Sequence, residues 1–172
     1  MNIKKVVAIL TIGVLFAMAA GADDFWSGRL QYDRGVAAYP EREFSLDLLG
    51  SYATRNRHGH SDAFGFGVGA NYFWMRYFGV GLDTYADAFR APYLLNASII
   101  ARYPIQDTAF APYAFGGFGR QWEYAPQWLG HIGLGVEYRF NARTGVFLDA
   151  RRVFPDSTDD YALWRFGLRL AF

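Results

Sequence analysis

The sequence contains no cysteine. This absence excludes disulfide bonds, thiolate metal sites, cysteine nucleophiles and the lipidated cysteine that a lipoprotein signal needs. The sequence also lacks an excess of charge of either sign, since its formal net charge at pH 7 is +1. A basic stripe that could follow phosphates is missing, so we expect no nucleic-acid partner. The length of 172 residues predicts a single domain.

Residues 1–22 have the pattern of a targeting segment. Lys4 and Lys5 precede an apolar run over residues 6–20, and the segment closes with small residues up to Ala22. A positive start, a short apolar stretch and small residues at −3 and −1 are typical of a Sec signal peptide. We predict cleavage after Ala22, with Ala19 as the alternative. An uncleaved anchor is the other interpretation, but it needs about 20 apolar residues. No later stretch of the sequence is long and apolar enough to span as a helix, so membrane insertion would require strands.

Aromatic residues make up 19 % of the chain, and there are 19 glycines. Glycine disfavours helices by about 1 kcal/mol relative to alanine, whereas aromatic residues favour strands. From residue 43 onward, apolar residues alternate with small or polar ones, which is the period of strands with two unlike faces. The pattern predicts an all-β fold, an eight-stranded antiparallel transmembrane β-barrel. Its strands are expected over residues 43–54, 63–75, 78–89, 92–103, 109–122, 128–140, 144–154 and 160–172.

The two faces of these segments differ in kind. In the last segment, Trp164, Phe166, Leu168, Leu170 and Phe172 alternate with Arg165, Gly167, Arg169 and Ala171. A soluble barrel would place the bulky face inside. Aromatic residues, however, gather near segment ends, as Trp122 and Trp128 do, and such girdles mark the two membrane–water interfaces. We therefore predict that the bulky face meets lipid, and a soluble barrel remains the alternative.

The other face would line the lumen. It carries Ser45, Asp47, Asn71, Asp83, Asp87, Asn96, Arg102, Arg120, His131, Glu137, Arg139, Asp149, Arg151, Arg165 and Arg169. An eight-stranded barrel is just wide enough to be filled by side chains, and acids and bases are about balanced. We predict a packed lumen charge network in place of an apolar core, because buried charges must be paired. Its charged members are Asp83, Asp87, Arg102, Glu137, Arg139, Asp149, Arg151, Arg165 and Arg169. A narrow pore lined by Arg102, Arg151, Arg165 and Arg169 is the alternative.

An even number of strands would place both barrel termini on the periplasmic side. The connections at residues 76–77, 104–108 and 141–143 then become periplasmic turns, and those at 55–62, 90–91, 121–127 and 155–159 become outer loops. Residues 23–42 do not alternate cleanly, so we predict a periplasmic N-terminal lead-in, with a short plug or lipid-surface segment as the alternative. The outer-membrane β-barrel would then cover residues 43–172.

Candidate catalytic residues gather at one place. His58, Ser61 and Asp62 could activate a serine for acyl transfer, and two imidazoles of this loop could hold a divalent metal loosely. Neighbours in a glycine-containing loop rarely hold such geometry, and these types are ordinary loop residues. His131 is expected to be a structural hydrogen-bonding partner. We predict no enzyme, no cofactor and no metal site.

Four stretches carry a resemblance to a known family: residues 111–119, 131–140, the turn 141–145 and the closing 164–172. With them the chain resembles, over residues 43–172, the small outer-membrane β-barrel superfamily that includes outer-membrane protein A/X-type and opacity-like barrels. The resemblance implies a location in the bacterial cell outer membrane. It also implies a barrel-assembly signal at Phe166, Leu168, Leu170 and Phe172, which the barrel-assembly machinery reads after delivery by periplasmic chaperones.

The expected function is that of a non-enzymatic outer-membrane barrel with a porin-like architecture, which contributes to envelope integrity or surface interaction. Its expected partners are outer-membrane lipid and lipopolysaccharide, and it is expected to be a monomer. The alternatives are a lipid A-modifying enzyme, acting by acyl transfer or deacylation, and a small solute pore. The deacylases of the superfamily carry a His-x-Ser-Asn motif late in the barrel, where residues 150–157 of this chain have no histidine. The palmitoyltransferase uses outer-rim His, Asp and Ser, which His58, Ser61 and Asp62 match only in type.

Overall fold

The computed structural model describes residues 38–55, 63–87, 94–106, 108–122, 126–157 and 159–172. All of them belong to one compact unit, Tyr32–Phe172. The strands are β1 (Glu43–Arg55), β2 (Ala63–Phe73), β3 (Phe78–Asp87), β4 (Leu94–Arg102), β5 (Phe110–Gln121), β6 (Gln127–Arg139), β7 (Thr144–Pro155) and β8 (Tyr161–Ala171). Among these residues, no helix is long and apolar enough to cross a membrane.

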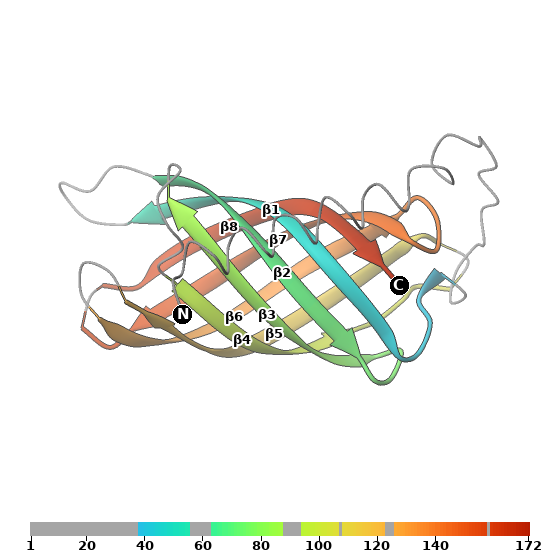
Figure 1. Cartoon of the computed structure of the whole chain (residues 1–172), viewed down its shortest axis with the longest axis horizontal. Helices are drawn as coiled ribbons and strands as arrows, with labels where there is room; N and C mark the ends of the chain where they lie inside the picture. Colours follow the sequence, from blue (N-terminus) through green and yellow to red (C-terminus); the bar gives the residue numbers. More distant parts are fainter. Residues whose placement is uncertain (1–37, 56–62, 88–93, 107, 123–125, 158) are drawn as a thin grey trace, which may run out of the picture. The chain divides into compact units, whose positions relative to one another are not determined.

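The strands form a closed barrel in which each strand pairs with its neighbours in sequence (Figure 1). β1 closes the ring by pairing antiparallel with β8, from Ser45 opposite Ala171 to Arg55 opposite Tyr161. Beyond the ladder, the N–H of Phe172 donates to the carbonyl of Phe44 at 2.8 Å. The predicted fold class, an all-β barrel of eight antiparallel strands, is confirmed. Closure leaves no unpaired strand edge, as a membrane requires.

Strand bounds differ from the predicted ones by a few residues, for local reasons. β2 ends at Phe73 rather than at Met75, because Met75 and Phe78 exchange backbone hydrogen bonds of 3.3 and 3.4 Å and so form a tight turn. β6 begins one residue early, because Gln127 pairs with Gln121. We call the end of the barrel with the β2–β3, β4–β5 and β6–β7 connections the turn end, and the opposite end the loop end.

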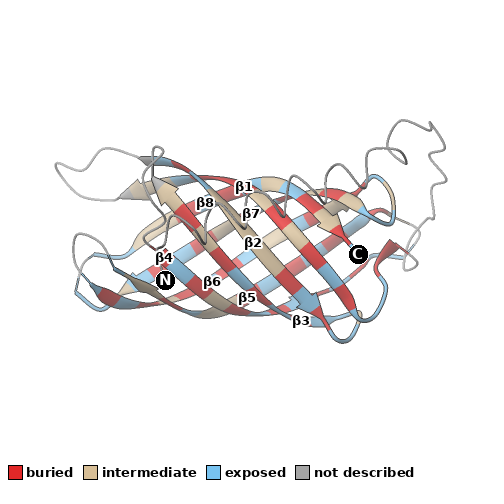
Figure 2. Ribbon diagram, in the orientation of Figure 1, coloured by how far each residue is buried: buried red, intermediate tan, exposed pale blue. Residues whose placement is uncertain are grey.

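Burial alternates along the strands (Figure 2). Over β4 and β6, inward residues are buried and outward ones mostly exposed. The outward side chains are large and apolar; Ile99 is 66 % exposed and Leu134 is 69 % exposed. A continuous apolar wall of this kind is unfavourable in water and suits lipid. Aromatic rings flank it, with Tyr77 stacked on Tyr103 at 6.3 Å at the turn end and Phe118 6.5 Å from Trp128 near the loop end.

Glycine allows close approach where β8 meets β1. A Cβ atom built on Gly167 would collide with the backbone carbonyl oxygen of Leu48, which cannot move without breaking the ladder. On the outer face of the same seam, the ring of Phe166 covers Gly50, where an added Cβ would lie 2.7 Å from the ring. By contrast, a Cβ on Gly130 would meet no atom within 4 Å.

We predict that Gly167→Ala lowers the free energy of unfolding by about 2 kcal/mol or more, because the β1–β8 seam must shift to accept the methyl group. Gly130→Ala is the matched control and is expected to stay within about 0.5 kcal/mol of the original protein. Urea unfolding of the refolded barrel, followed by tryptophan fluorescence, measures both. Equal stability of the two variants would contradict the close approach at Gly167.

Candidate functional site

The interior of the barrel holds two clusters of buried ion pairs. The first, which we call the turn-end cluster, lies toward the turn end and consists of Glu43, Asp47, Arg102, Glu137, Arg139 and Arg169. Arg169 joins two of its carboxylates: its Nη2 lies 2.7 Å from Oδ2 of Asp47, and its Nη1 lies 2.6 Å from Oε2 of Glu137. The cluster has as many carboxylates as guanidinium groups, so its formal charge is zero.

Glu43, the first residue of β1, ties the rest of this cluster together. Its Oε1 accepts from Nη1 of Arg102 at 2.9 Å and from Nη2 of Arg139 at 2.7 Å. Arg139 also donates through Nε to Oε1 of Glu137 at 2.6 Å. The guanidinium carbon of Arg102 lies 3.8 Å from the ring centroid of Phe73, so the charge also rests on an aromatic face. The predicted lumen face did not include Glu43, although this residue stands in phase with Ser45 and Asp47 on β1.

The second cluster, which we call the central cluster, consists of Asp83, Asp149, Arg151 and Arg165. Arg165 donates two hydrogen bonds to the carboxylate of Asp149, from Nε at 2.8 Å and from Nη2 at 2.9 Å. Its Nη1 lies 3.2 Å from Oδ2 of Asp83. Arg151 donates through Nη2 to the same oxygen at 2.8 Å. This cluster is also neutral. Asp87, the remaining predicted member of the charge network, has a side chain outside the described residues.

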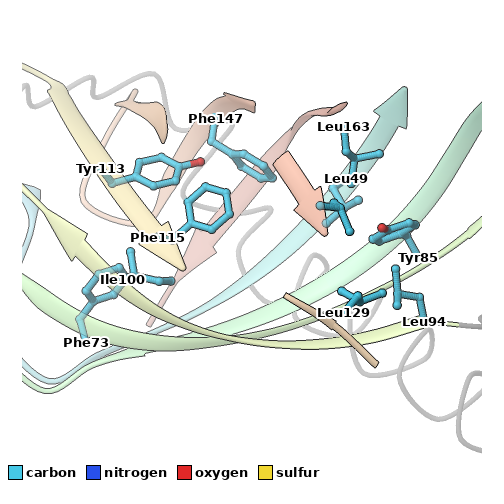
Figure 3. Close-up of a cluster of buried hydrophobic side chains, with 11 residues drawn as sticks. Leu49, Phe73, Tyr85, Leu94, Ile100, Tyr113, Phe115, Leu129, Phe147 and Leu163 are labelled. Carbon is cyan, nitrogen blue, oxygen red and sulfur yellow. The ribbon is translucent and has the colours of Figure 1, made fainter. Parts of the chain in front are cut away.

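An aromatic layer lies between the two clusters. Tyr113, Phe115 and Phe147 point into the interior from β5 and β7 (Figure 3). The hydroxyl of Tyr113 donates to Oδ2 of Asp149 at 2.8 Å, and the Arg165 guanidinium lies 5.1 Å from the Phe115 centroid. The predicted buried ion pairs are present, but buried apolar side chains fill the interior beside them, which the prediction of a polar network in place of an apolar core did not include. The apolar content was missed because these rings stand in phase with glycines such as Gly117, and a face rich in glycine was taken to be polar throughout.

A second apolar layer lies on the loop side of the central cluster. The layer includes Tyr85, Val153 and Leu163, all of them buried. Each lies on the same strand as Asp83, Arg151 or Arg165, two positions closer to the loop end. Leu94 and Leu129 complete this layer from β4 and β6 (Figure 3). The charged clusters are thus separated from the loop end by packed apolar side chains. This arrangement does not favour the alternative of an arginine-lined pore.

Tyr39 covers the turn end of the interior. It is fully buried, and its hydroxyl donates to the carbonyls of Ala109 at 2.8 Å and Glu137 at 3.4 Å. The guanidinium carbons of Arg102 and Arg139 lie 4.8 and 4.6 Å from the centroid of its ring. Burial, and to a lesser extent the Glu137 carboxylate, raises the pKa of the Tyr39 hydroxyl well above its usual value. Tyr39 belongs to the predicted lead-in, and its side chain closes the interior of the barrel at the turn end.

The described residues include His131 but not the loop that holds the candidate catalytic residues. The loop with His58, Ser61 and Asp62 lies outside the described residues. Inside the barrel, the Ser98 hydroxyl lies 2.9 Å from Nε2 of His131, and both are buried. Nδ1 of His131 is buried without a hydrogen-bond partner, so no carboxylate orients the imidazole as a triad requires. Within the described part of the chain, no group of three acids, histidines or cysteines could hold a metal ion.

One predicted lumen residue faces the other way. Arg120 lies on the outward face of β5, two residues after the exposed Phe118, and its guanidinium carbon is 4.9 Å from the ring centroid of Trp128. The assignment of Arg120 to the lumen is wrong. The reason is the alternation along β5. The odd-numbered positions, such as Gly117 and Gly119, face the interior, so the even-numbered residues, including Arg120, face outward.

The residues of the expected assembly signal lie on the lipid-facing side of the last strand. Phe166 and Leu168 belong to the outward face of β8 and are exposed, and Phe172 is 6.4 Å from the ring of Phe44 across the closing seam. Leu170 follows the same outward phase and is partly buried. Their placement is that of lipid-facing wall residues.

Comparisons with known proteins support the fold. No protein-family model and no curated protein sequence matches the chain. Among solved structures, the N-terminal β-barrel domain of OprF from Pseudomonas aeruginosa is similar with a TM-score of 0.64 at 13 % identity, covering 77 % of this chain and 98 % of that one. A de novo designed transmembrane β-barrel gives 0.59 at 15 % identity, covering 77 % and 97 %. Neisserial surface protein A gives 0.57 at 15 % identity, covering 76 % and 96 %.

Identities this low show the fold alone. The chain has the fold of the small outer-membrane β-barrels, with exposed apolar side chains on the wall and buried ion pairs inside. The predicted resemblance to these barrels is confirmed at that level.

We predict that Arg165→Met destabilises the barrel by about 3–5 kcal/mol, because Asp149 and Asp83 then lose a buried counter-charge. The double variant Arg165→Met with Asp149→Asn keeps the cluster neutral and is expected to recover part of the loss. Arg152→Met is the control, since its pair with Asp160 is half-exposed and worth about 0–1 kcal/mol. Urea midpoints of the refolded proteins test this ranking, and a single variant as stable as the control would refute it.

We also predict that Tyr39→Phe costs about 1 kcal/mol, the value of a buried hydrogen bond, and that Tyr39→Ala costs about 3 kcal/mol because the ring contacts go too. Unfolding of the mature chain in lipid vesicles measures both changes. If the alanine variant unfolds with the original midpoint, Tyr39 does not hold the turn end closed.

Proposed function

We propose that the chain is a non-enzymatic protein of the bacterial outer membrane, a closed barrel that contributes to envelope integrity or surface interaction. One observation carries the proposal: two separately neutral ion-pair clusters and two apolar layers fill the interior beneath an apolar wall. A filled lumen gives solutes no polar path through the described residues. The functional surfaces that remain are the lipid-facing wall and the loop end.

The proposed orientation follows from the even number of strands. The turn end, with Tyr39, faces the periplasm, and the loop end faces outward. Residues 1–22 would be the Sec signal peptide, residues 23–42 the periplasmic lead-in, and residues 43–172 the barrel. Phe166, Leu168, Leu170 and Phe172 would be read by the barrel-assembly machinery after periplasmic chaperones deliver the chain, and they would then become part of the wall of a monomer.

Two alternatives make different demands on the molecule. A solute pore needs a path past Tyr39 and past the layer of Leu94, Leu129 and Leu163. A lipid A-modifying enzyme needs the His58–Ser61–Asp62 loop to act on acyl chains at the outer rim. Nothing in the described residues favours either alternative.

A strain that lacks the protein tests the proposal. We expect increased uptake of a hydrophobic dye, and restoration of the barrier both by the original protein and by the variant His58→Ala with Ser61→Ala. The mass profile of lipid A is expected to be the same with and without the protein, and planar bilayers holding the purified barrel are expected to be silent.

Each contrary result points to one alternative. A lipid A profile that changes with the protein, together with failed restoration by the double variant, would establish the enzyme. Steady conductance that shifts in Arg165→Gln or Arg169→Gln would establish the pore. A protein that fractionates as soluble and shows no electrophoretic shift on boiling would exclude a membrane barrel altogether.

A further inference from the structure

Two arginines lie on the lipid-facing wall near the loop end. Arg152 stands on β7 between the inward residues Arg151 and Val153, opposite Ile132 on β6 and Ala162 on β8. Arg120 stands on β5 opposite Trp128 of β6, one residue before the strand ends. Both arginines therefore flank β6 from its two sides. A cation on this face costs about 2–4 kcal/mol at the bilayer midplane and about 0–1 kcal/mol near the interface.

The contacts of these arginines leave each guanidinium group accessible from the membrane side. The guanidinium carbon of Arg120 lies 4.9 Å from the ring centroid of Trp128, so its charge contacts an aromatic side chain of the wall. Arg152 lies 3.5 Å from Asp160, and the two side chains are 48 % and 43 % exposed. An arginine has five N–H donors in a planar fork that matches phosphate oxygens. The carboxylate of Asp160 and the ring of Trp128 engage only some of the N–H donors of Arg152 and Arg120.

Between the two arginines, β6 presents a gap in the wall. Gly130 faces outward opposite Phe118 of β5 and Phe154 of β7. A Cβ atom built on Gly130 would meet nothing within 4 Å, while Phe118 is 63 % exposed and Phe154 is 43 % exposed. The two aromatic side chains thus stand on either side of bare backbone, about 10 Å apart at two strand spacings. We call Phe118, Arg120, Trp128, Gly130, Arg152 and Phe154 the Gly130 notch.

We propose that the Gly130 notch binds a diphosphorylated glycolipid of the outer leaflet, of the lipid A type. Its two phosphates would meet Arg120 and Arg152, and an acyl chain would lie over Gly130 between Phe118 and Phe154. The proposal rests on the proposed function, since it requires the loop end to face the outer leaflet. It assigns a specific site on the wall to a glycolipid, of the class that the sequence leads us to expect as a partner.

The spacing of the cations argues for this occupant. Arg120 lies opposite Trp128 and Arg152 lies opposite Ile132, four residues further along β6, so their backbones are about 16 Å apart, within reach of two long side chains and an extended headgroup. A headgroup with phosphates at the two ends of a disaccharide can reach both, whereas a glycerolipid carries one phosphate. Arginine–phosphate pairs are charge-assisted and frequently bidentate, and each guanidinium already lies in the wall, so little ordering is needed on binding.

Native mass spectrometry of the mature protein in detergent provides the test. The probes are diphosphoryl lipid A, monophosphoryl lipid A and phosphatidylglycerol. We expect the original protein to bind diphosphoryl lipid A most tightly. Arg120→Gln with Arg152→Gln should lower that affinity by roughly tenfold or more, and Gly130→Leu, which fills the notch, should lower it as well. Arg143→Gln removes a charge at the turn end and should bind like the original protein.

Electrophoresis of boiled and unboiled samples shows in parallel that every variant is folded. The proposal is overturned if the double arginine variant retains the original affinity, or if phosphatidylglycerol binds the original protein as tightly as diphosphoryl lipid A does. Those results leave the envelope role untouched, because they concern a folded barrel. Loss of the boiling shift in the original protein would instead remove the proposed function.

Discussion

Backbone N–H and C=O groups inside a membrane must find their partners within the protein, because hydrocarbon offers none. The strands meet this demand by closing into a ring, from the β1–β2 ladder round to the β1–β8 ladder. Closure then creates a narrow interior that water does not fill freely, and every charge placed there must be neutralised by another side chain. The wall, the interior and the two ends of this molecule all follow from that requirement.

The interior meets the requirement by local neutrality. Arginines of the turn-end cluster pair with Glu43, Asp47 and Glu137, and those of the central cluster pair with Asp83 and Asp149. Each cluster is neutral by itself, so no ion pair has to form across the aromatic layer that separates the two clusters. Aromatic faces beneath the guanidinium groups add a second kind of contact. The barrel therefore has a core in which apolar layers alternate with charged ones.

The two ends of the barrel are finished differently. Tyr39, from outside the strands, closes the turn end: its single hydroxyl proton is shared by two backbone carbonyls, and its ring contacts two guanidinium groups. The loop end is closed from within by side chains of the strands themselves, including Leu94 and Leu129. On the outside, the described strand residues depart from an uncharged wall at Arg120 and Arg152, which flank Gly130. Acyl chains offer these charges no counter-ion, so this part of the wall suits a lipid with a charged headgroup.

The sequence by itself determined where the strands lie and, for most strand residues, whether the side chain points into the barrel or toward lipid. Strict alternation over β6 and β8 places Glu137, Arg139, Arg165 and Arg169 on one side, because successive side chains in a strand point to opposite faces. Only the tertiary structure decided which charges pair, since Arg169 and Asp47 meet through the closing seam, 122 positions apart in the chain. It also decided the outward direction of Arg120, the closing of the turn end by Tyr39 and the apolar interior layers. Alternation gives a phase within one strand, whereas register between strands and the reach of side chains across a lumen depend on the closed ring.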